Sequence, residues 1–137
     1  MTLNETYSFL GQVRRKDYAM QCKILQRDEL QASLLPKAIA YDSDRVQTSP
    51  EDRQSEIMSK IVELDQVIEQ MRVRRSEAVK RVCEALDQLP DDRERLILTH
   101  YYVTGHTMER TAEVVGYTVQ HVYRLRDRGV RHLSALI

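Results

Sequence analysis

The stretch Thr107–Leu133, TMERTAEVVGYTVQHVYRLRDRGVRHL, decides the fold of this chain. Thr107 can cap a first helix, because its hydroxyl accepts a hydrogen bond from an otherwise unpaired amide. Gly116 suits the end of that helix, where a left-handed backbone carries no steric cost for glycine. Thr118 can cap a second helix, whose apolar side chains recur every three or four residues. These are Val122, Leu125, Gly129, Val130 and Leu133. The pattern predicts a helix-turn-helix, whose second helix fits the major groove of DNA.

The predicted second helix has an outward face opposite Val122 and Leu125. It carries Val119, Gln120, Tyr123 and Arg124. A glutamine can bond to an adenine edge and an arginine to a guanine edge in two-pronged fashion. The alternative is that these side chains are merely solvated. Six other side chains nearby are candidates for contact with the DNA backbone. These are Thr107, Thr118, His121, Arg126, Arg128 and Arg131. For the histidine and the three arginines among them, salt bridges within the protein are the alternative.

The same residues resemble the fourth region of bacterial sigma factors, which binds the promoter element upstream of the start site. The resemblance covers about residues 78–135 and rests on a fixed order of small, apolar and basic positions. Its members are Leu86, Leu89-Pro90, Arg93-Glu94-Arg95, Gly105, Thr107, Ala112, Gly116, Thr118, Val122, Arg128-Gly129-Val130 and Leu133. Thr111 stands where the family has Ile, and Gly129 where it has Ala. The resemblance implies that Val119, Gln120 and Arg124 contact bases and that Tyr123 contacts DNA nearby.

The plan of the whole chain, a helical front half followed by this module, resembles the ArpU/RinA-type late-transcription regulators of phages infecting Gram-positive bacteria. That resemblance implies a phage or prophage protein that acts at promoters in the cytoplasm of a bacterial host.

A heptad repeat runs through residues 51–89 and predicts a long helix with one apolar seam. The seam has ten positions, of which only Arg75 is polar: Ile57, Ile61, Leu64, Ile68, Met71, Arg75, Ala78, Val82, Ala85 and Leu89. One interpretation is an antiparallel hairpin with residues 3–33, and the other is a seam between chains. Both can hold in one four-helix arrangement. For assembly, the predicted residues are Ile57, Ile61, Leu64, Ile68 and Met71.

The segments around the long helix are predicted from local signals. Residues 3–33 are expected to be helical, with a break near Gly11 to Arg15, where the apolar stripe changes face. Ser49 and Pro50 suit a helix start. Asp42 and Asp44 lack the glycine and closing glutamate of a calcium loop.

After Leu89-Pro90, an aspartate at position 91 or 92 should cap a third helix. Its apolar face is predicted to cover the helix-turn-helix. That face consists of Leu96, Ile97, Tyr101 and Val103. Gly129 lies inside a helix, where alanine is preferred by about 1 kcal/mol, so Gly129→Ala is expected to stabilise the fold unless a close helix crossing needs the missing methyl group.

Composition narrows the function. The formal net charge of the 137 residues is zero, but residues 116–137 carry four arginines against Asp127 alone. This places positive charge on the proposed recognition helix. Cys22 and Cys83 lack metal spacing and are expected to be reduced thiols. The histidines lack zinc-ligand spacing. Because the sequence has neither a nucleophile motif nor a phosphate loop, we expect neither an enzyme nor a bound cofactor or metal. There is also no apolar run long enough to span a membrane.

The sequence therefore predicts an all-α chain in two parts. Residues 1–75 form a helical hairpin or coiled coil for oligomerisation, and residues 76–137 a sigma region 4-like DNA-binding domain. The favoured function is a transcription regulator that binds double-stranded DNA as a homodimer or other small homo-oligomer, with RNA polymerase as a further candidate partner. The alternatives are a phage small terminase subunit and a module that binds RNA polymerase or a sigma factor.

Overall fold

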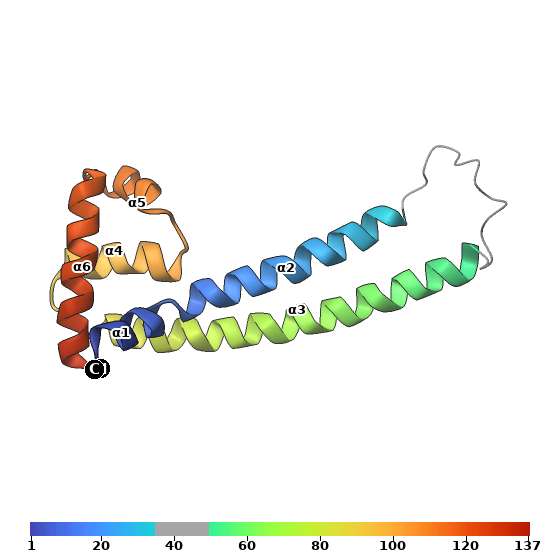
Figure 1. The fold of residues 1–137 in the computed structure, drawn as a ribbon, viewed down its shortest axis with the longest axis horizontal. Coiled ribbons are helices and arrows are strands. Elements are labelled where there is room, and N and C mark those ends of the chain that lie inside the picture. The colour runs from blue at the N-terminus through green and yellow to red at the C-terminus, as the bar shows by residue number, and fades with distance from the viewer. Residues whose placement is uncertain (35–49) are drawn as a thin grey trace. The chain divides into compact units, whose positions relative to one another are not determined.

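The computed structural model describes residues 1–34 and 50–137, and their regular structure is entirely helical (Figure 1). The all-α prediction is therefore confirmed. The elements are α1 (Leu3–Leu10), α2 (Gln12–Ser33), α3 (Pro50–Leu86), α4 (Asp92–Leu98), the π-helix η2 (Thr99–Val103), α5 (Met108–Val115) and α6 (Val119–Leu136). Within the described part of the chain, no helix is both long and apolar enough to span a bilayer.

The chain forms two compact units. The first consists of Met1–Asp17 together with Arg74–Ile137, and the second of Tyr18–Val73. The sequence division at residue 75 grouped the first 17 residues with the hairpin, whereas the structure packs them against the helix-turn-helix end. Tyr7 shows this, because its hydroxyl donates to Asp127 Oδ1 of α6 at 3.1 Å. The long-range contact explains why local sequence signals could not assign the first helix.

Helix α1 begins at a capping box. The backbone N–H of Glu5 donates to Thr2 Oγ1 at 3.2 Å, and the Glu5 carboxylate accepts from the Thr2 N–H at 2.9 Å, which satisfies two amides of the first turn. The helix ends at Leu10 with Gly11 as its C-cap, and α2 begins at Gln12, so the predicted break is confirmed. Arg15 folds back across this break, and its guanidinium donates to the Ser8 carbonyl at 2.8 Å.

Helix α3 begins at Pro50, and the predicted cap Ser49 lies outside the described residues, as do Asp42 and Asp44. In the second unit α3 forms a hairpin with α2, and Arg27 of α2 donates to Asp65 of α3 at 3.1 Å. Near the other end of α3, Arg75 pairs with Asp17. The heptad seam therefore packs at least partly within one chain, as the hairpin interpretation predicts.

The core of the first unit has two adjoining clusters. The larger joins residues of α1, α2, α3, η2 and α6 to Leu98, and the smaller joins Ile97 to residues of α5 and α6. The prediction that Leu96 belongs to the buried face is wrong, because Leu96 is 47% exposed and Leu98 is fully buried. Successive residues of an α-helix point about 100° apart. When Ile97 and Leu98 each face one cluster, Leu96 must point away from both.

Helices α4 and α6 cross closely at Gly129. A β-carbon on Gly129 would lie 3.0 Å from Leu98 Cδ1 and 3.2 Å from Glu94 Cβ. Both neighbours are fully buried and would have to move to make room. The sequence predicts that Gly129→Ala stabilises the fold unless a close helix crossing needs the missing methyl group. The structure has such a crossing, so a gain in stability is no longer expected.

Candidate nucleic-acid interface

The helix-turn-helix is held by three local devices. The N–H of Arg110 donates to Thr107 Oγ1 at 3.0 Å, which caps α5. Gly116 ends α5 in the left-handed conformation with φ +77°. The N–H of His121 donates to Thr118 Oγ1 at 3.2 Å, which caps α6. All three predicted roles are confirmed.

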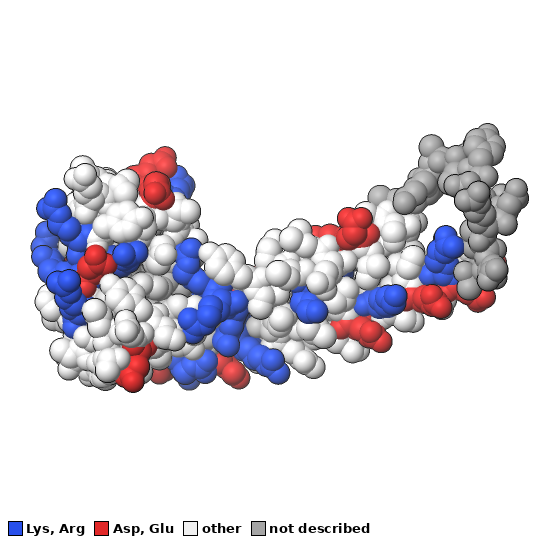
Figure 2. All heavy atoms as spheres, viewed as in Figure 1, with Lys and Arg blue, Asp and Glu red and all other residues white. Residues whose placement is uncertain are grey.

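Helix α6 has one buried and one exposed face. Its buried residues are Val122, Leu125, Gly129, Val130 and Leu133, as predicted. The opposite face of the first two turns is exposed and carries Val119, Gln120, Tyr123 and Arg124. Figure 2 shows blue side chains along the edge of the molecule that α6 forms. The structure therefore brings these four predicted side chains together on one surface at the start of α6.

Arg126 lies between the exposed face and the core. Its guanidinium contacts the rings of Tyr123 and Tyr101, with centroid distances of 4.9 and 5.8 Å, and pairs with Asp127 at 3.1 Å. The ring of Tyr101 also contacts the guanidinium of Arg14 in α2, at 4.3 Å from the ring centroid. The cation–π contacts hold Arg126 beside the exposed face.

Arg128 is held by acidic side chains of the first unit. Its Nε donates to Glu94 Oε1 at 2.7 Å, and a terminal nitrogen donates to Asp91 Oδ2 at 3.3 Å. Glu94 is fully buried, and its carboxylate also lies 2.9 Å from His132 Nδ1. Asp91 caps α4, as predicted, and backbone N–H groups of Glu94 and then Arg93 lower the pKa of its carboxyl, helped by nearby arginine charges. Arg128 thus has the salt-bridge geometry that the sequence left as an alternative to a phosphate contact.

Sequence reasoning missed the role of Glu94. A signal was available, because Glu94, Ile97, Leu98 and Tyr101 follow the spacing of one inward helix face.

The remaining two candidates for contact with the DNA backbone, His121 and Arg131, are on α6. His121 is half-buried and lies edge-on to Tyr117 at 4.9 Å between ring centroids, and Arg131 is exposed.

A pair of histidines, also missed, lies just before the helix-turn-helix. The rings of His100 and His106 stack, with their Nδ1 atoms 3.1 Å apart. Burial, and then the charge of His106, lower the pKa of His100. The π-helix η2 and the following turn bring the two residues together, a geometry that regular helical spacing does not anticipate. Across residues 1–34 and 50–137, no cluster of three or more His, Cys, Asp or Glu is arranged to hold a metal ion.

The predicted assembly residues all lie on α3 but differ in burial. Ile61 and Ile68 are buried, whereas Ile57, Leu64 and Met71 are half-buried. Ile61 and Ile68 are therefore already buried by packing within one chain.

Comparison with known families agrees with this geometry. Residues 85–135 match the family model described as Sigma-70, region 4. This part of the chain is similar to a sigma-70 region 4 helix-turn-helix domain. The domain contains α4, η2, α5 and nearly all of α6, and its family implies DNA binding. No curated protein and no solved structure matches the chain.

Proposed function

We propose that the chain is a sequence-specific DNA-binding transcription regulator, encoded by a phage or prophage and acting at promoters in the cytoplasm of its bacterial host. One observation carries the DNA-binding part: the start of α6 exposes Val119, Gln120, Tyr123 and Arg124 within the region that matches sigma-70 region 4. The phage origin and the regulatory role rest on the resemblance of the chain's plan to the ArpU/RinA-type regulators.

The base contacts come from the first two turns of α6. Gln120 bonds to an adenine edge and Arg124 to a guanine edge, because their side chains offer the matching donor and acceptor pairs. Val119 and Tyr123 supply apolar and aromatic contact on either side. Tyr123 and Val119 are more than a third exposed, and Gln120 and Arg124 are exposed beside them, which supports the assignment.

The backbone contacts come from groups around that face. Thr107 and Thr118 accept backbone N–H bonds through their hydroxyl oxygens, which leaves each hydroxyl hydrogen available for a phosphate. Arg131 is an exposed cation on α6, and His121 and Arg126 flank the reading face. We assign Arg128 chiefly to positioning α6, because it is paired with Glu94 and Asp91.

The long helices serve assembly in this proposal. A small homo-oligomer would present two recognition helices to two half-sites, as dimeric helix-turn-helix regulators do. The alternative, a terminase-like packaging subunit, would form larger rings, so the mass in solution separates the two functions. RNA polymerase remains a further candidate partner of the regulator.

Mapping the protein's binding across its source genome tests the proposal. We expect enrichment at a few promoter-proximal sites that share a sequence, and loss of that enrichment for Arg124→Ala. Binding spread evenly over the genome, or confined to a packaging-type site with ring-sized particles in solution, would overturn the regulatory role.

A further inference from the structure

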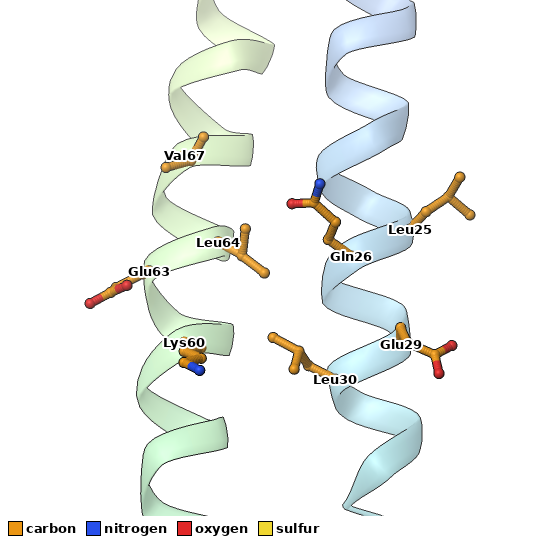
Figure 3. A pocket seen from close by; sticks show the side chains of 8 residues that line it. All are labelled: Leu25, Gln26, Glu29, Leu30, Lys60, Glu63, Leu64 and Val67. Atoms are coloured by element: carbon orange, nitrogen blue, oxygen red, sulfur yellow. The ribbon is translucent and has the colours of Figure 1, made fainter.

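The second compact unit has an open apolar groove along its hairpin. The groove has a volume of about 760 Å³ and is lined from both helices. Its apolar lining consists of Leu25 and Leu30 of α2 and Leu64 and Val67 of α3. Figure 3 shows Leu30 and Leu64 pointing toward each other across the space between the two helices.

The hairpin has too little core to account for these side chains. Among the described residues of Tyr18–Val73, Ile61 and Ile68 are the buried hydrophobic side chains. Leu25 is 59% exposed and Val67 36% exposed. Two helices alone cannot enclose their apolar stripes, and the stable solutions pack such a pair against further helices. As far as residues 1–34 and 50–137 are concerned, the groove therefore has the character of an uncovered half of a core.

The charges at the groove favour a partner that carries both signs. Lys60 and Glu63 line it from α3, and Glu29 lines it from α2. In a two-fold contact the same surface meets itself, so Lys60 of one chain can face a carboxylate of the other. A strongly basic partner would leave Lys60 opposed by like charge, and a nucleic acid would meet two carboxylates and a wide apolar surface.

We propose that this groove is the contact surface for a second copy of the chain, so that two hairpins form a four-helix arrangement around Leu25, Leu64 and Val67. The inference rests on the homo-oligomer in the proposed function and specifies its surface. It also moves the interface away from the centre of the heptad seam, because Ile61 and Ile68 are already buried within one chain. Lys60, Leu64 and Val67 follow helical spacing and form a stripe that shares Leu64 with the seam but lies beside the buried Ile61 and Ile68.

The test compares glutamate substitutions in the full-length chain. Leu25→Glu and Val67→Glu place a charge in the groove. Val62→Glu is the matched control, because Val62 is an apolar residue of the same helix, 51% exposed, and does not line the groove. Light scattering coupled to size exclusion gives the mass over a range of concentrations, and circular dichroism checks the helix content. All three sites are at least a third exposed, so the variants are expected to fold.

We expect the wild type and Val62→Glu to run as dimers, and both groove variants to dissociate at concentrations roughly tenfold or more higher, as for central interface residues. Lys60→Glu should also weaken the dimer, and adding Glu63→Lys should recover it. A monomeric wild type, or groove variants that keep the dimer mass, would overturn the inference. So would an equal loss in Val62→Glu.

DNA titration of the same samples separates this inference from the proposed function. A groove variant that is monomeric but still prefers one sequence over random DNA supports both. If the wild type is dimeric through the groove yet lacks any sequence preference, the regulator proposal is wrong, whereas the proposed interface is still supported.

Discussion

Arg128 Nε donates to the buried carboxylate of Glu94 at 2.7 Å and so ties α6 to α4. His132, one helical turn further along α6, lies 2.9 Å from the same carboxylate. Gly129 follows Arg128 and faces the β-carbon of Glu94. The missing side chain at Gly129 therefore lets α6 come close enough for both neighbours to reach one buried acid. This contact helps to set where the exposed face of α6 lies.

Arg128→Ala should lower the free energy of unfolding by roughly 1–3 kcal/mol, because it removes a charged donor from a buried acceptor. The lower half of that range is favoured, since the Arg128 side chain is 47% exposed and solvent screens part of its charge. Urea unfolding measures the change. Arg131→Ala, an exposed arginine of the same helix, serves as the control and should stay within about 0.5 kcal/mol of the wild type. Equal losses for the two variants would show that the Glu94 contact contributes nothing special.

Gly129→Ala should destabilise the domain. Alanine gains about 1 kcal/mol of helix propensity, but a side chain forced into a packed core costs typically 1–3 kcal/mol. The buried Leu98 and Glu94 leave little room to relax, so we expect a net loss. Thermal unfolding measures it. As a control, Arg131→Gly compared with Arg131→Ala, at an exposed interior position of the same helix, should show the propensity effect alone. A higher melting temperature for Gly129→Ala would mean that α4 shifts at little cost.

The devices that local sequence determines were predictable. Thr107, Gly116 and Thr118 act through hydrogen bonds or dihedral angles within one turn of the chain, so their residue types alone indicate their roles. The spacing of Val122 and Leu125 likewise fixed which face of α6 is buried and which is exposed.

Features that depend on distant contacts were not predictable in the same way. The burial of Glu94 depends on partners more than 30 residues away. Leu98 is buried and Leu96 is exposed because both core clusters pack against α4. The His100–His106 pair depends on the π-helix η2, whose residues follow no simple apolar period.

The histidine pair should make stability fall in mild acid. The pKa of His100 is lowered by burial and then by His106, so between this pKa and about 6.5 the unfolded chain binds more protons than the folded one. The contribution is present above pH 6.5 and is lost as the pH falls through the folded pKa. Unfolding measured from pH 8 to 5 should show a smaller loss for His100→Asn than for the wild type. Parallel curves for the two proteins would contradict this origin.

Base reading and phosphate binding can be separated on α6. Arg124→Ala should lose roughly 1–3 kcal/mol on the cognate site and little on random DNA, because a two-pronged base contact carries discrimination. Arg131→Ala should weaken both DNAs similarly and reduce the salt slope by about one, since one fewer counterion is released. Cognate and random duplexes titrated at several salt concentrations give all of these values.

The outcomes of these titrations locate the reading face. If Arg124→Ala weakens both DNAs equally, Arg124 contacts a phosphate, and the bases are read by side chains on another part of α6. If neither substitution changes binding to any DNA, the exposed face of α6 binds protein, and a polymerase-binding module becomes the better explanation. Arg128→Ala adds a further check, because a residue that positions α6 through Glu94 should alter cognate affinity while leaving the salt slope nearly unchanged.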